Sequence, residues 1–122
     1  MIEGIVTAEH EAKVEILVQG MNGQDYPFDV IVDTGFTGCL TLPPQVIKAL
    51  QLPWREWGEA ILADGSEITY HVNDASVHWD GQMITIPVDE ADSPPLLGMR
   101  LMQGYWILIE DIDGGSVRLE RL

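Results

Sequence analysis

The chain is poor in basic residues. Among its 122 residues, six are Lys or Arg and 20 are Asp or Glu, which gives a formal net charge of −14. Proteins bind nucleic acids largely by neutralising phosphates with Lys and Arg, so we expect no nucleic-acid partner. An anionic membrane surface is disfavoured for the same reason. The acidic excess favours solubility and disfavours acidic ligands.

Cysteine and long apolar runs are also scarce. The single Cys39 cannot form an internal disulfide. No charged basic residue stands near it in the sequence, so we interpret it as a small core residue rather than a nucleophile. No stretch approaches the roughly 18 apolar residues that span a bilayer, and residues 1–6 lack the basic segment of a secretory signal. We therefore expect a cytoplasmic protein with no membrane partner.

Most of the chain shows the alternation of β-strands. Val14, Ile16 and Val18 share one face of a run whose other face is polar, which predicts a half-buried strand. Further strands are predicted over residues 28–32, 75–79, 83–88, 106–109 and 117–119. Turns are predicted at Asn22-Gly23, Asp80-Gly81 and Asp113-Gly114.

Helical signals are few. Residues 44–50 begin with proline and have apolar spacing typical of a short helix. Residues 99–103 predict a second short helix that ends at Gly104. The length suits one domain over residues 1–122, and many short strands indicate an all-β, barrel-like domain.

A candidate site follows the apolar run 30–32. This strand leads directly to Asp33, Thr34 and Gly35, in a turn that contains a second glycine at Gly38. Burying a carboxylate costs free energy unless donors reach its oxygens. Glycine allows the backbone to fold close to a carboxylate, so the N–H groups around Gly35 are suitable donors. Asp-Thr-Gly by itself is also compatible with an ordinary strand-to-turn junction.

Two later segments extend this pattern. Residues 60–70 predict a hairpin with its turn at Asp64-Gly65, and Leu96-Leu97-Gly98 precedes the second predicted helix. In this order, the three features resemble the retropepsin-like (clan AA) aspartic proteases, and specifically their small bacterial single-domain members. The resemblance extends roughly over residues 14–119. It implies a retropepsin-like closed barrel with a flap hairpin and one or two short helices.

The resemblance also implies roles for individual residues. Asp33 is the implied catalytic carboxylate. Thr34 and Gly35 are implied to support the active-site loop against the same loop of a second chain. The implied flap residues over a bound peptide are Ala63, Asp64, Gly65 and Ser66. Leu97 and Gly98 are implied to pack beneath the active-site loop.

Peptide hydrolysis by this route needs two carboxyl groups that share a proton, one to accept a proton from water and one to polarise the carbonyl. The chain contains one Asp-Thr-Gly. Segments 64–66 and 111–114 are the most similar, but neither follows a comparable buried strand. The second carboxylate must then come from a second copy across a two-fold axis. We therefore predict a homodimeric aspartic endopeptidase that acts on peptides or proteins with an activated water and no cofactor.

Phe36 departs from the family pattern, in which the better-known members carry alanine or serine. Its ring either forms an apolar wall of the cleft or points away as a core aromatic. This departure motivates an alternative function: a catalytically weak or inactive dimeric module that binds or scaffolds peptides, since fold does not fix function.

The remaining candidates favour structural roles. His10, His71 and His78 lack metal-ligand spacing, so we expect no metal site. The twelfth position counted from Asp111 is Leu122 rather than glutamate, which favours a turn over a calcium loop. We expect the four tryptophans in the core or at the dimer interface. Residues 2–7 and 117–122 are strand-like ends that we expect to contribute to subunit contacts.

Overall fold

The computed structural model describes residues 1–122 and contains ten strands and one helix. In chain order these are β1 (Ile2–Val6), β2 (Ala12–Gln19), β3 (Asp25–Val32), β4 (Leu40–Leu42), α1 (Pro44–Leu50), β5 (Trp54–Ile61), β6 (Glu67–Trp79), β7 (Gln82–Glu90), β8 (Leu96–Leu97), β9 (Tyr105–Ile109) and β10 (Ser116–Arg121). The all-β prediction is confirmed.

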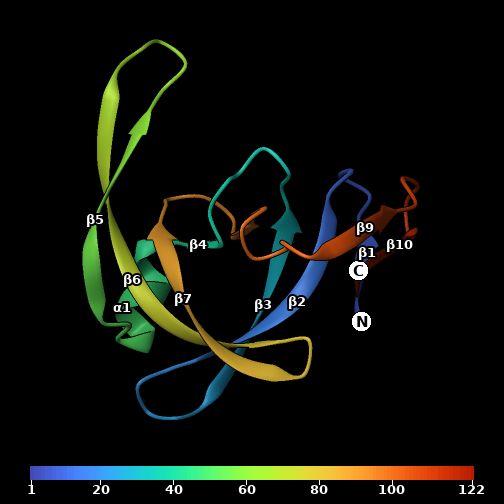
Figure 1. Cartoon of the computed structure of the whole chain (residues 1–122), viewed down its shortest axis with the longest axis horizontal. Coiled ribbons are helices and arrows are strands. Elements are labelled where there is room, and N and C mark those ends of the chain that lie inside the picture. The colour runs from blue at the N-terminus through green and yellow to red at the C-terminus, as the bar shows by residue number, and fades with distance from the viewer.

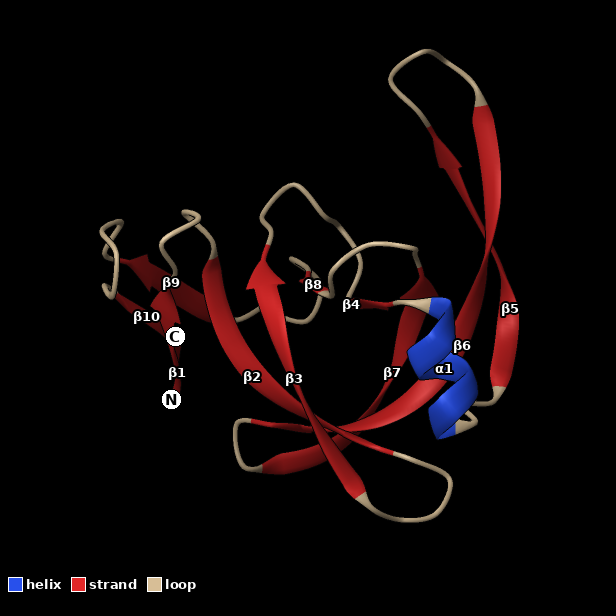
Figure 2. Ribbon diagram, turned by 180° about the vertical axis from the view of Figure 1, so that it is seen from behind, coloured by secondary structure: helices blue, strands red, loops and turns tan.

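The strands form one sheet that curls back on itself. Its order is β5-β6-β7-β4-β8-β3-β2-β1-β10-β9, and an additional antiparallel pairing joins β2 to β6. This pairing runs from Leu17 opposite His78 to Gln19 opposite Ser76. The β2–β3 and β6–β7 hairpins therefore cross at their closed ends, while their open ends diverge (Figures 1 and 2). A core of 21 buried residues fills the interior of the curled sheet.

The predicted alternation positions this core. Val14, Ile16 and Val18 are at most 2% exposed, whereas Glu15 between them is exposed. Each buried side chain on a strand removes apolar surface from water, which is the main driving force for closing the sheet. The same alternation makes Val88 of β7 fully buried, so its neighbours on β7 face the other side of the sheet.

The predicted first helix is confirmed as α1. It begins at Pro44, buries Ile47 and Leu50, and is followed by the capping residue Gln51, which adopts the left-handed conformation with φ 54°. The predicted second helix over residues 99–103 is wrong, because this segment forms successive turns. The backbone N–H groups of Met99 and Arg100 instead donate to carbonyls of the Asp33 loop, which fixes the path of this segment.

The predicted hairpins are also present. Asp80 and Gly81 join β6 to β7 with φ values of 48° and 82°, the left-handed pair typical of a tight two-residue turn. The β5–β6 hairpin extends well beyond the body of the molecule and turns at Gly65, with φ 85° (Figure 1). The loop after β3 rises on the same side of the molecule as this hairpin (Figure 1).

Both ends of the chain lie inside the sheet. β1 pairs with β2 and β10, and β10 pairs with β1 and β9. Neither terminal strand has a free edge in a single chain, and the contribution of these ends to subunit contacts stays a prediction. The free edges of the sheet are β5 and β9. No helix has the length and apolar character needed to cross a membrane.

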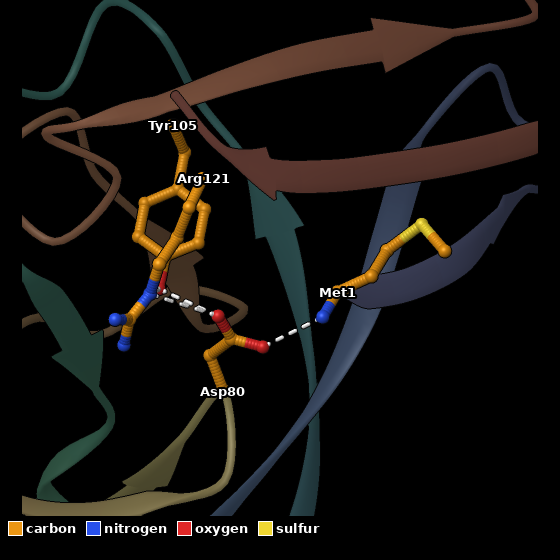
Figure 3. A network of polar contacts seen from close by, with 4 residues as sticks. All are labelled: Met1, Asp80, Tyr105 and Arg121. Carbon is orange, nitrogen blue, oxygen red and sulfur yellow. Dashed lines mark hydrogen bonds and ion pairs between the residues drawn. The ribbon is translucent and has the colours of Figure 1, made fainter.

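A polar network ties these ends to the β6–β7 turn (Figure 3). Asp80 Oδ1 accepts a hydrogen bond from the Met1 ammonium at 2.7 Å, and Oδ2 accepts bonds from the Tyr105 hydroxyl at 2.9 Å and Arg121 Nε at 3.2 Å. The bonds from the ammonium and Tyr105, with the charge of Arg121, lower the pKa of Asp80. The network therefore stabilises the charged form of Asp80.

Candidate active site

Asp33 is the first residue after the partly buried end of β3. Its backbone N–H donates to the Leu97 carbonyl at 2.9 Å, and its Oδ1 accepts the Gly35 N–H at 2.9 Å. The expected donation from Gly35 is thus confirmed. Asp33 is half-buried, whereas Thr34 and Gly35 are exposed at the tip of the loop. The carboxylate is held in place by a short local bond at a position that solvent reaches.

The loop over residues 33–39 is fixed by the segment after β8. β8 pairs in parallel with β3, with Val32 opposite Leu97. Beyond this pair, three backbone bonds join the two segments. They run from Gly98 N to Cys39 O at 2.9 Å, from Met99 N to Phe36 O at 2.8 Å and from Arg100 N to Gly38 O at 3.1 Å. Leu97 is fully buried beside the loop, so the structure brings Leu97 and Gly98 into contact with it.

Phe36 packs over two glycines. A Cβ atom at Gly38 would lie 2.6 Å from Cζ of Phe36, and one at Gly98 would lie 2.6 Å from Cδ2 of the same ring. A Cβ at Gly98 would also lie 2.0 Å from the carbonyl oxygen of Gly38. These distances are too short for any real Cβ, so the loop and the ring both require glycine here. Phe36 is half-buried and lines the cleft, so the core-aromatic alternative is wrong.

A cleft of about 800 Å³ separates the loop from the β5–β6 hairpin. Loop residues 35–39 form one side, and β5 forms the other. The floor comes from β6 and β7. Its lining residues are Gly35, Phe36, Thr37, Gly38, Cys39, Arg55, Glu56, Gly58, Glu59, Ala60, Ile61, Tyr70, Val72, Pro87, Asp89 and Arg100. Asp33 does not line the cleft itself but lies two residues from its rim.

Burial controls the titration of the groups around this cleft. Burial raises the pKa of Asp89, and the charge of Arg100 partly opposes this effect. Burial, followed by the nearby Asp89 carboxylate, raises the pKa of Tyr70. Burial also raises the pKa of the Cys39 thiol, which is 7% exposed. A buried thiol held protonated is a poor nucleophile, in agreement with the core role predicted for Cys39.

The tip of the β5–β6 hairpin is an exposed, locally bonded turn. Asp64 Oδ1 accepts bonds from the Ser66 N–H at 2.9 Å and the Ser66 hydroxyl at 2.6 Å, which lower the pKa of Asp64. Gly65 N–H donates to the Leu62 carbonyl at 2.9 Å. The four residues singled out as a flap, Ala63 to Ser66, therefore form the turn, but none of them lines the cleft. The part of the hairpin beside the active-site loop is β5.

A second hollow lies on the other side of β3. It has a volume of about 440 Å³, and five of its eight lining residues are hydrophobic. These eight are Val6, His10, Glu11, Ala12, Ile31, Val32, Ile109 and Asp111. Ile31 and Val32, immediately before Asp33, are only partly buried in a single chain. The Asp33 loop is thus flanked by the cleft on one side and by this smaller hollow on the other.

The histidines and tryptophans have other surroundings. His71 Nδ1 accepts a bond from Trp54 Nε1 at 3.1 Å, and its ring lies 4.4 Å from that of Trp57. Trp79 is buried, as predicted, but Trp54 and Trp57 are 53% and 58% exposed. No group of three or more His, Cys, Asp or Glu residues could hold a metal ion.

Sequence reasoning missed Tyr70, Asp89 and Arg100 as cleft residues. Of these three, Asp89 was the most predictable from the sequence. It follows the apolar alternation of Ile84, Ile86 and Val88, so it must face the opposite side of the strand. The pairing that joins this face to the loop is not visible in the sequence.

Comparison with known proteins supports the architecture. The chain is similar to the solved structure of EIAV protease complexed with the inhibitor HBY-793, with a TM-score of 0.56 and 20% sequence identity over 79% of this chain and 88% of that chain. No protein-family model matches the chain. No curated protein matches it either. At this identity the likeness shows the fold: an all-β, retropepsin-like domain with one short helix. Membership of the small bacterial group stays a prediction.

Proposed function

We propose that the chain is one subunit of a homodimeric aspartic endopeptidase, with Asp33 as its catalytic carboxylate. The observation that carries this proposal is the position of Asp33. It follows a strand that enters the core, it is held by the Leu97 carbonyl and the Gly35 N–H, and it lies two residues before Gly35, which lines a cleft of about 800 Å³. The retropepsin-like fold makes peptide hydrolysis the first reaction to test.

The requirement for a second chain follows from the count of carboxylates. Asp33 makes its one side-chain hydrogen bond to the backbone of Gly35, and no other carboxylate of the chain bonds it. Two carboxyl groups about 3 Å apart share one proton, because both cannot ionise together. A second copy that brings its own Asp33 to a two-fold axis would complete this pair. The hollow at Ile31 and Val32, five of whose eight lining residues are hydrophobic, offers surface for such a contact.

In this dimer each residue has a defined task. The ionised Asp33 accepts a proton from the attacking water, and the protonated Asp33 of the other copy polarises the scissile carbonyl. The exposed Thr34 and Gly35 are the first loop residues to meet the other copy. The hairpin tip at residues 63–66 would cover the bound peptide, and peptide side chains would occupy the cleft beside Phe36. No cofactor is required.

The decisive variant is Asp33→Asn, which keeps the shape of the side chain and removes the acid. We expect cleavage of a peptide library to be lost while circular dichroism and sedimentation stay unchanged. Asp29→Asn is the matched control, since Asp29 is an exposed aspartate on β3, the strand that leads to Asp33. Because the site needs both copies, excess Asp33→Asn chain should also inhibit the parent by forming mixed dimers. If Asp33→Asn cleaves as fast as the parent, the assignment of Asp33 is wrong.

The second candidate is a dimeric peptide-binding module without turnover. The observation that favours it is the Phe36 ring, which lines the cleft two residues from Thr34 and packs over Gly38 and Gly98. In that case the parent should bind peptides and hydrolyse none across acidic and neutral pH. Asp33→Asn should then leave binding unchanged.

A further inference from the structure

Asp89 is a half-buried carboxylate that faces the cleft. It lies on β7 directly after the fully buried Val88, so its side chain points to the opposite side of the strand. It is paired with Val72 of β6 and with Thr41 of β4. Its Oδ2 lies 3.2 Å from the position that a Cβ atom would take at Gly38. The carboxylate is therefore in contact with the loop that carries Asp33.

The chain supplies no hydrogen-bond donor to this carboxylate. The charge of Arg100 acts on Asp89, but the two residues form no ion pair within 4.0 Å. A carboxylate that has lost part of its water and gained no donor is electrostatically uncompensated. Such a group in a cleft is suited to a cationic partner from outside the chain.

The other charges of the cleft strengthen the same preference. Glu56 and Glu59 line it from β5, and neither forms an ion pair. Of the two arginines, Arg55 is already paired with Asp74 at 3.0 Å. Three unpaired carboxylates therefore face one unpaired guanidinium. The net charge of −14 adds a long-range attraction for cations.

We propose that the cleft selects peptides with a lysine or arginine side chain, and that Asp89 is the residue that recognises it. This inference rests on the proposed function, because it names the substrate class of that site. An ammonium or guanidinium group would donate the charge-assisted bonds that Asp89 lacks. The Phe36 and Tyr70 rings would contact the aliphatic stem of the same side chain.

The test compares peptides that differ at one position, with lysine, glutamine or glutamate. Binding is measured by fluorescence anisotropy and cleavage by kcat/KM, for the parent and for Asp89→Asn. We expect the parent to prefer lysine over glutamine about tenfold, equivalent to about 1.4 kcal/mol, and Asp89→Asn to lose this preference. Asp89→Lys should invert it in favour of glutamate. Asp92→Asn is the control, because Asp92 is exposed and does not line the cleft.

The outcomes separate this inference from the proposed function. A lysine preference in binding without cleavage supports recognition by Asp89 and refutes hydrolysis. Cleavage without a lysine preference, or a preference that persists in Asp89→Asn, overturns the inference and leaves hydrolysis intact. Absence of both binding and cleavage for every peptide overturns the two together.

Discussion

Replacing Gly98 by alanine tests whether the segment after β8 fixes the loop that carries Asp33. The added Cβ would lie 2.0 Å from the Gly38 carbonyl oxygen, and contacts below 3.0 Å essentially never occur. The two backbones must therefore separate by at least about 1 Å. Such a shift lengthens the bonds from Gly98 to Cys39 and from Arg100 to Gly38, now 2.9 and 3.1 Å, beyond hydrogen-bond range.

The expected cost follows from these two effects. Two lost backbone bonds cost about 1 kcal/mol each. Overpacking in a close-packed region adds about 1–3 kcal/mol. The sum, about 3–5 kcal/mol, is a large fraction of the stability of a small domain. Peptide cleavage should fall as well, because the Asp33 backbone N–H donates to the Leu97 carbonyl at the start of the same segment.

Urea unfolding followed by tryptophan fluorescence, at one fixed protein concentration, measures this change. Gly35→Ala is the control, because its Cβ would meet only the movable Asp33 carboxylate, at 3.2 Å. We expect this control to stay within about 1 kcal/mol of the parent. A Gly98→Ala protein as stable as Gly35→Ala would refute the idea that the segment after β8 fixes the Asp33 loop, since it would show that the loop moves away at little cost in free energy.

Three further predictions concern other parts of the chain. Folding lowers the pKa of Asp80 from its ordinary value of 3.8. The network around Asp80 therefore stabilises the protein above pH 3.8, and this stabilisation is lost as the pH falls through the lowered pKa. Asp80→Asn should destabilise the protein at neutral pH and differ less from the parent in acid, as measured by urea midpoints. Each chain carries −14, so the dissociation constant of the proposed dimer should fall as salt screens the repulsion; sedimentation that shows a flat or rising constant would contradict this. Gly65 has φ 85°, so Gly65→Ala should cost about 1–2 kcal/mol locally and speed amide exchange at the hairpin tip, while exchange in β2 stays unchanged.

Local patterns predicted most of the fold. The alternation of Val14, Ile16 and Val18 and the proline at Pro44 each act within one element, so the sequence near them was sufficient. The prediction of a helix over residues 99–103 failed, because tertiary bonds from this segment to the Asp33 loop determine its path. The free edges of the sheet, β5 and β9, could not be predicted either. Which strands lie at an edge depends on the order of the whole sheet, and no local pattern records that order.

The candidate site was predictable only in part. Asp33 and its bond to Gly35 follow from neighbouring residues, and the hairpin turn at Asp64-Gly65 follows from turn chemistry. The cleft residues could not be found in this way. Tyr70 and Asp89 face the loop because β6 pairs with β7 and β7 pairs with β4, and these pairings join segments far apart in the chain. The residues that would contact a substrate therefore depend on the long-range register of the sheet.

Phe36 and the two glycines beneath it form a unit that can be separated by mutation. At Gly98 an added Cβ meets backbone, whereas at Gly38 its closest contacts are atoms of the Phe36 ring, at 2.6 and 2.7 Å. Gly38→Ala should therefore cost about 1–3 kcal/mol in the parent and much less in Phe36→Ala, where the ring is gone. Gly98→Ala should remain costly in both backgrounds. Urea unfolding of the four proteins in each cycle gives the coupling, and equal costs of Gly38→Ala with and without the ring would show that Phe36 does not determine the requirement for glycine at position 38.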